Sequence, residues 1–126
     1  MNLLLDSCAL IGLSNGNLSA ASSRALGAGV PAFVCSVSVW EIAIKHQSGK
    51  VRLLSPPKDW FAALAQRYAL QEIPLQQSTA CAAAALPPLH KDPFDRVIVA
   101  TALEHQLQIL TSNQIIPTYP GVACLW

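Results

Sequence analysis

The sequence predicts a three-layer α/β/α fold with a central parallel sheet. Short apolar runs of strand length alternate with longer helix-like segments along the whole chain, as they do in parallel α/β proteins. Hydrophobic residues make up 52% of the chain and charged residues only 12%, which excludes a disordered chain and favours a substantial core. No repeat, low-complexity tract or linker divides the sequence. Residues 1–126 are therefore expected to form a single domain.

The first strand is expected at residues 1–6, where the apolar run MNLLLD ends at an acid. A helix follows over residues 7–16 and is closed by an Asn-Gly turn. Residues 19–29 are rich in alanine and predict a second helix, which glycines terminate. The run VPAFVCS at residues 30–36 predicts the second strand.

Residues 36–51, SVSVWEIAIKHQSGKV, predict a third helix. Ser36 or Ser38 is a suitable N-cap for it. Trp40 and Ile44 lie four residues apart and are expected in its buried apolar stripe.

The second half of the chain continues the alternation. Helices are expected at residues 55–70, 76–86 and 92–106, and strands at residues 70–75, 107–112 and 122–126. In a parallel sheet, ligands bind beyond the carboxyl ends of the strands. Asp6, Ser36 and the segment 111–113 all fall at or just after a predicted strand end. These positions are the first indication of a site.

The global properties limit the range of functions. The net charge of +1 excludes a generally basic nucleic-acid-binding chain, so any attraction for RNA must be local. No apolar run approaches the roughly 20 residues that span a bilayer, and the N-terminus lacks the basic flank of a signal peptide. The four cysteines are widely spaced, which is typical of a reducing compartment. A cytoplasmic protein is expected, and its few charges favour an apolar surface for a partner.

Asp92 and Asp95 bracket Pro93-Phe94 at the start of a predicted helix. As a helix start, Asp92 is a good N-cap, Pro93 fits the first helical position, and the acids face the positive end of the helix dipole. Two other acids favour a second interpretation. Asp6 follows a strand, and Glu41 lies within an apolar helix where an unpaired carboxylate is costly, unless it pairs with Lys45.

Carboxylates from these segments are candidates for one rim of the sheet. Several of them in one crevice repel one another unless cations screen the charge. Oxygen ligands of this kind select Mg²⁺ or Mn²⁺ rather than zinc. Such ions activate water and neutralise charge in phosphodiester hydrolysis.

Three ordered motifs carry a family resemblance. LLLDSCALIGL at the N-terminus, VSVWEIAIKHQSGKV, and LPPLHKDPFDRVIVATALEHQLQILTSN resemble the PIN-domain proteins of the VapC-like toxin branch of bacterial toxin–antitoxin systems. The closing YPGVACLW resembles the last strand of that family. The resemblance runs from Met1 to Trp126 and is least distinctive over residues 52–85.

The resemblance implies a PIN-like fold and a Mg²⁺- or Mn²⁺-dependent endoribonuclease. It also implies cleavage by water that leaves a 5′-phosphate and a 3′-hydroxyl, a cognate antitoxin that occupies the groove, and a homodimer. Carried over by position, it makes Asp6, Glu41 and Asp95 the metal-binding acids and Ser7 the accompanying hydroxyl. Asn113 stands where many members have a fourth acid. Asp92 is either a helix cap or a group next to the ligands.

Asn113 keeps an oxygen but removes one negative charge, so a second ion is expected to bind weakly. Five basic residues flank the acid-bearing segments and are candidates for contact with RNA phosphates: Lys45, Lys50, Arg52, Lys91 and Arg96. Lys45 has the alternative of neutralising Glu41, and Arg96 that of lying on the solvated face of its helix.

Three further assignments are structural. His90 and His105 are expected to be solvated helix-end groups, and Cys8 a small packed thiol rather than a nucleophile. The tryptophans, Trp40, Trp60 and Trp126, are expected in the core or at an interface.

The competing function is a catalytically weak or inactive PIN-like module that binds RNA or protein. Asn113 and the low basic charge favour it, whereas the repulsion among the other acids counts against it. An aspartyl-phosphate phosphatase also begins with an acid at a strand end. Such enzymes need a second acid two residues later, and that position is Cys8.

Overall fold

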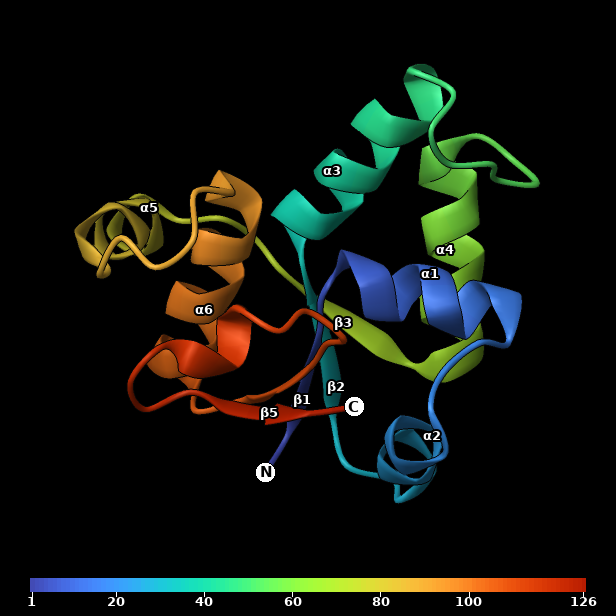
Figure 1. Cartoon of the computed structure of the whole chain (residues 1–126). Coiled ribbons are helices and arrows are strands. Elements are labelled where there is room, and N and C mark those ends of the chain that lie inside the picture. The colour runs from blue at the N-terminus through green and yellow to red at the C-terminus, as the bar shows by residue number, and fades with distance from the viewer.

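A computed structural model describes all 126 residues and shows five parallel strands in the order β3-β2-β1-β4-β5 (Figure 1). The strands are β1 (Leu3–Leu5), β2 (Ala32–Cys35), β3 (Leu70–Ile73), β4 (Gln108–Leu110) and β5 (Ala123–Leu125). The helices are α1 (Ser7–Asn15), α2 (Ala20–Gly27), α3 (Ser36–Gln47), α4 (Pro57–Tyr68), α5 (Gln77–Ala85) and α6 (Pro93–His105), with a 3₁₀ turn η1 (Ile116–Thr118). The predicted three-layer α/β/α fold is confirmed, and only η1 was not anticipated.

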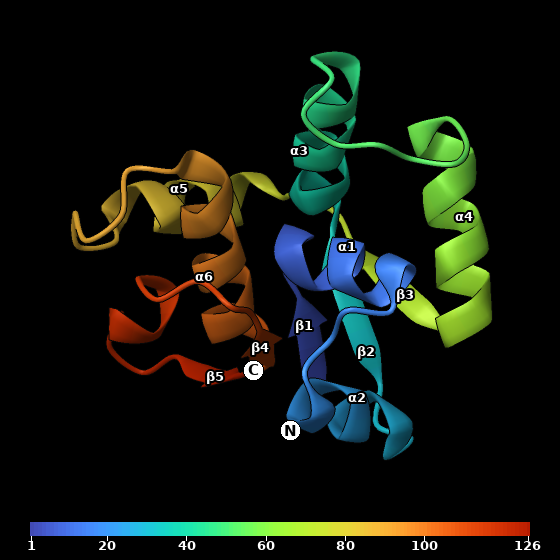
Figure 2. The ribbon, with the colours of Figure 1, turned by 45° about the vertical axis from the view of Figure 1, so that its right-hand side comes forward.

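Side chains of the central strands alternate between two cores. On β1, Leu3 and Leu5 pack with α1 and α4, whereas Leu4 packs with α6 on the opposite face. On β4, Leu110 joins the first core and Ile109 the second. Helices therefore cover both faces of the sheet, α1 and α4 on one side and α5 and α6 on the other (Figure 2).

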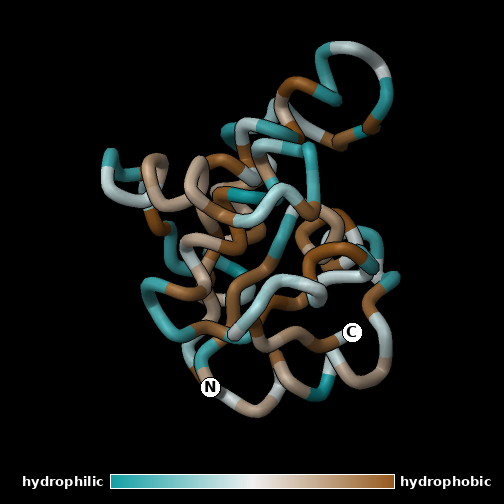
Figure 3. The backbone as a smooth tube through the Cα atoms, turned by 60° about the vertical axis from the view of Figure 1, so that its left-hand side comes forward, coloured by the Kyte–Doolittle hydropathy of each residue, from teal (hydrophilic) through white to brown (hydrophobic).

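The burial of β1 explains its composition. Leu3, Leu4 and Leu5 are all at most 1% exposed because helices lie on both faces and strands on both edges. In Figure 3 the hydrophobic stretches pass through the middle of the chain trace, and many hydrophilic stretches lie in the outer loops. None of the helices is long and apolar enough to span a bilayer.

The prediction for α3 was wrong in two respects. Trp40 and Ile44 were expected in its buried stripe, yet they are 60% and 45% exposed. The inward side of α3 instead carries Val37, Ile42 and the carboxylate of Glu41. Neither Ser36 nor Ser38 caps the helix. Ser36 Oγ accepts a hydrogen bond from the backbone N–H of Leu75 at 3.0 Å, and Ser38 is buried without a partner for its hydroxyl.

Candidate active site

The strand order reverses direction at β1, since β2 and β3 lie to one side of it and β4 and β5 to the other. In open parallel sheets this reversal opens a crevice at the carboxyl ends of the two neighbouring strands. Asp6 directly follows β1, and Thr111 directly follows β4. Both are buried. Buried polar side chains therefore follow both strands at the edge where this general rule places a crevice.

Asp6 is held in place by the start of α1. Its Oδ1 accepts the backbone N–H of Ala9 at 2.8 Å, so the carboxylate is also the N-cap of the helix. Burial raises the pKa of Asp6, and Glu41 raises it further, while hydrogen bonds from Thr111 and the α1 backbone oppose this effect. Sequence analysis missed Thr111, although its position after the strand was noted.

Glu41 reaches the same crevice from α3 and is only 6% exposed. Its Oε1 accepts the hydroxyl of Ser7, and its Oε2 accepts Lys45 Nζ, both at 2.8 Å. The hydrogen bond to Glu41 raises the pKa of Lys45, so this ammonium remains charged. The i, i+4 ion pair of Glu41 with Lys45 is therefore confirmed, and the role of Glu41 as a metal ligand stays a prediction.

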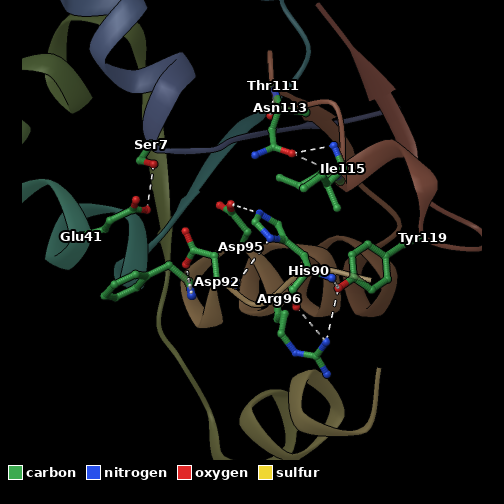
Figure 4. A network of polar contacts seen from close by, with 12 residues as sticks. Ser7, Glu41, His90, Asp92, Asp95, Arg96, Thr111, Asn113, Ile115 and Tyr119 are labelled. Carbon is green, nitrogen blue, oxygen red and sulfur yellow. Dashed lines mark hydrogen bonds and ion pairs between the residues drawn. The ribbon is translucent and has the colours of Figure 1, made fainter. Parts of the chain in front are cut away.

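Asp95 lies in the first turn of α6, is 8% exposed and carries the most perturbed carboxyl group. Burial raises its pKa to about 6, and the carboxylates of Asp92 and Glu41 add to the shift. Asp92 caps α6 through a 2.9 Å bond from the N–H of Phe94 to its Oδ1. Asp92 is thus a helix cap and also an electrostatic neighbour of Asp95. Figure 4 shows Glu41, Asp92 and Asp95 around the same space.

His90 was expected to be a solvated group, and that expectation was wrong. Its Nε2 lies 2.8 Å from Oδ2 of Asp95, and its side chain is 15% exposed. His90, Asp92 and Asp95 are the only three His, Cys, Asp or Glu residues whose ligand atoms all lie within 4.8 Å of one another. The spacing H-x-D-x-x-D at a helix start is the sequence signal that would have identified this group.

Asn113 occupies the predicted position beside the crevice, but its amide oxygen is already in use. Oδ1 accepts the backbone N–H groups of Ile115 at 2.7 Å and Ile116 at 3.2 Å, at the start of η1 (Figure 4). The N–H of Asn113 in turn donates to Thr111 Oγ1. The first role of this side chain is therefore to shape the loop after β4.

The basic residues separate into two groups. Lys50, Arg52 and Lys91 are exposed and form no ion pair, so they remain free to meet phosphates. Lys45 is paired with Glu41 but is still 43% exposed.

Arg96 does not fit the expectation of phosphate contact. Its Nη1 and Nη2 donate to the carbonyls of five residues in the segment 83–90, which are Ala83, Ala84, Leu86, Pro87 and His90. Nη1 also contacts the hydroxyl of the buried Tyr119 at 3.3 Å. The guanidinium thereby joins the end of α5 and the loop before α6, and we remove Arg96 from the candidates for RNA binding.

Two other assignments change. Cys8 is exposed rather than packed. Partial burial of the thiol group itself raises its pKa, and the charge of Asp6 raises it further, which disfavours a nucleophilic thiolate. Trp60 is buried, as predicted. Trp40 is exposed and packs edge-on against Phe94, with ring centroids 5.1 Å apart. An aromatic pair therefore lies beside the acids of α3 and α6.

Comparison with known proteins identifies the family. The PIN domain pattern matches residues 3–121, which is nearly the whole chain. The chain belongs to the PIN-domain family. It is also 30% identical over 112 residues to ribonuclease VapC22 of Mycobacterium tuberculosis, a match that covers 86% of this chain and 85% of that protein. The resemblance inferred from the three motifs is therefore confirmed.

Solved structures that are similar to this PIN domain include toxin–antitoxin complexes. A toxin–antitoxin complex from Klebsiella pneumoniae contains a chain with 25% identity and a TM-score of 0.68, and the match covers 96% of the PIN domain and 95% of that chain. VapBC2 from Rickettsia felis, bound to a DNA fragment from its promoter, contains a chain with 13% identity and a TM-score of 0.75, covering 99% and 98%. The second likeness concerns the fold alone.

Proposed function

We propose that this PIN domain is a divalent-metal-dependent endoribonuclease that acts as the toxin of a toxin–antitoxin pair. The observation that carries the proposal is the burial of three carboxylates, from Asp6, Glu41 and Asp95, near the reversal point of the sheet, where the charge of Glu41 acts on both of the others. Burial raises the pKa of Asp95, and the charges of Asp92 and Glu41 raise it further, an accumulation of buried acids for which a purely structural role does not account. The similarity to a ribonuclease of the VapC group supports the same activity.

The donor set suits a hard divalent cation. The carboxylates and the hydroxyl of Ser7 are oxygen donors of the type that Mg²⁺ and Mn²⁺ select. Only one lysine, Lys45, offsets the acids from α1 and α3, so net negative charge remains. The ligand atoms of Asp6, Glu41 and Asp95 do not all lie within 4.8 Å of one another, so these side chains would have to draw together to hold the ion. The ion, when bound, would lower the pKa of a water and neutralise charge on the phosphate.

Other side chains of the protein orient the acids and attract the RNA. Ser7 and Lys45 fix the two oxygens of Glu41, and Thr111 and the start of α1 orient Asp6. Lys50, Arg52 and Lys91 attract the RNA backbone without reading its sequence. An exposed Lys45 can turn from Glu41 toward a phosphate when a cation takes over its role beside the carboxylate.

The neighbouring structures support the proposed partners. Proteins similar to this chain were solved as toxin–antitoxin complexes. We propose a cognate antitoxin that covers the acid crevice, and a homodimer in the cytoplasm. The exposed side chains of Trp40 and Ile44 on α3 supply an apolar surface for such contacts.

The test uses the protein freed of any antitoxin and a mixed RNA pool. We expect cleavage with Mg²⁺ or Mn²⁺, none with EDTA, and none after Asp6→Asn, which keeps the N-cap but removes the charge. Asp59→Asn is the matched control, because Asp59 is an exposed acid in the first turn of α4. Intact RNA under every ion condition would instead favour a PIN-like module that binds without cutting, for which Asn113 is the supporting feature.

Asn113→Asp is expected to tighten metal binding by about tenfold, the order of effect of one added charge a few ångströms away. An aspartate can still accept the N–H groups of Ile115 and Ile116, so the loop geometry should persist. Calorimetric titration with Mg²⁺ measures the change. In the unmodified protein we expect one well-held Mg²⁺ ion, with a second Mg²⁺ recruited only alongside the substrate phosphate. Two equally tight sites in a Mn²⁺ titration would contradict this expectation.

A further inference from the structure

A cluster with a different donor set lies beside the three acids of the crevice. His90, Asp92 and Asp95 offer one nitrogen and two carboxylate oxygens, all within 4.8 Å of one another. The closest pair, His90 Nε2 and Asp95 Oδ2, is 2.8 Å apart (Figure 4). Two ligands on opposite sides of an ion with bonds of about 2.2 Å lie about 4.4 Å apart. The cluster therefore needs only small side-chain adjustments to enclose a cation.

The orientation of each member favours such a role. Oδ1 of Asp92 accepts the N–H of Phe94, which leaves its second oxygen for another partner. The loop that carries His90 is fixed, because its N–H donates to Tyr119 at 3.0 Å and its carbonyl accepts from Arg96. The ligand positions are thus held by α6, by the loop and by the buried Tyr119 before any ion binds.

No lysine or arginine forms an ion pair with this cluster, whose one basic contact is His90 itself. Lys45 is paired with Glu41, and Arg96 is bound to carbonyls of the segment 83–90. The hydrogen between Nε2 of His90 and Asp95 is the atom that a bound cation would replace.

We propose that His90, Asp92 and Asp95 form a second cation site that binds transition-metal ions such as Mn²⁺ in preference to Mg²⁺. The preference follows from the imidazole nitrogen, which is a good ligand for first-row transition metals, whereas Mg²⁺ favours oxygen ligands only. Asp95 belongs to both sites, so the proposal deepens the proposed function. It places the second ion on the α6 side of Asp95, and not next to Asn113, where the fourth acid is missing.

The test detects the nitrogen ligand directly, in full-length protein without RNA. Pulsed electron paramagnetic resonance of bound Mn²⁺ is expected to show coupling to ¹⁴N, and His90→Ala should abolish it. His105→Ala is the matched control, since His105 is an exposed histidine at the other end of α6. Titrations should show the affinity of the weaker Mn²⁺ site reduced by at least about tenfold in His90→Ala, and the affinity for Mg²⁺ reduced by much less.

Mn²⁺ without ¹⁴N coupling, or coupling that persists in His90→Ala, would overturn the second site. A circular dichroism spectrum and melting curve of His90→Ala show whether the variant is folded. If it is not, His90→Gln, which retains a polar side chain but no imidazole, replaces it in the same measurement. Metal-dependent RNA cleavage without ¹⁴N coupling would leave the nuclease proposal intact and reject this one. Coupling to ¹⁴N without any RNA cleavage would support the second cation site and contradict the nuclease proposal.

Discussion

Asp95→Asn is expected to lower RNA cleavage by at least about 100-fold and, at neutral pH, to make the metal-free protein more stable. The loss of activity follows from removing a charged ligand of the ion that would activate water and neutralise charge on the phosphate. The gain in stability has a separate cause. Asp95 is buried beside Asp92 and Glu41, and its contact with His90 only partly offsets their charges.

The direction of the stability change follows from proton binding. In the folded protein the pKa of Asp95 is raised from 3.8 to about 6. Between these values the folded protein holds a proton that the unfolded chain has lost, so the free energy of unfolding falls as pH rises. At neutral pH the loss has an upper limit of about 3 kcal/mol, at about 1.4 kcal/mol per pKa unit. Asparagine carries no charge and removes this loss.

Urea denaturation in EDTA at pH 4 and pH 7 measures the effect. The unmodified protein should lose stability between these pH values, and Asp95→Asn should lose less of it. Added Mg²⁺ should stabilise the unmodified protein by about 3 kcal/mol at 100 times its dissociation constant and the variant by much less. The same pH dependence of the free energy of unfolding in both proteins would show that Asp95 is not the carboxyl group whose raised pKa lowers stability.

The order of strands and helices could be predicted from the sequence because each segment has a clear apolar period and clear terminators. Asp92-Pro93 begins α6 and Asn15-Gly16 ends α1, with Gly16 in the left-handed conformation at φ 72°. These signals are local. They do not depend on which residues meet in space, so they persist in the fold.

The face of α3 could not be predicted in this way. The apolar pair Trp40 and Ile44 has the spacing of a buried stripe, yet the helix turns Glu41 and Ile42 inward instead. Periodicity treats a glutamate as a surface residue, and a helix that supplies a buried carboxylate violates that assumption. The departure from the apolar pattern coincides with the site.

The roles of His90 and Arg96 were missed for a different reason. Both depend on the path of the loop between α5 and α6, which has no repeating pattern. The carbonyls that Arg96 binds lie 6 to 13 residues earlier in the chain. From the sequence, His90 was assigned to solvent, and Arg96 was assigned to contact with RNA phosphates or to the solvated face of its helix. Only the fold shows that the end of α5 and the start of α6 meet.

Arg96→Ala is expected to lower the free energy of unfolding by about 3 kcal/mol, a large effect for a partly exposed residue. Its guanidinium donates to the carbonyls of Ala83 and Leu86 at 2.9 and 2.8 Å, and to that of Pro87 at 3.0 Å. Hydrogen bonds from charged donors contribute about 1.5–3 kcal/mol each, and their loss is not additive. The last carbonyls of α5 also lose their only side-chain donor.

Urea denaturation at pH 7 measures this difference, with Arg24→Ala as the control, because Arg24 is an exposed helical arginine without a recorded partner. Arg96→Lys should recover little of the stability, since one ammonium cannot reach carbonyls on both sides as a planar guanidinium does. The loop that Arg96 fixes carries His90 and leads to Asp92, so the nitrogen coupling of bound Mn²⁺ should weaken as well. If Arg96→Ala is as stable as Arg24→Ala, the observed contacts are not maintained in solution, and Arg96 returns to the residues available for RNA.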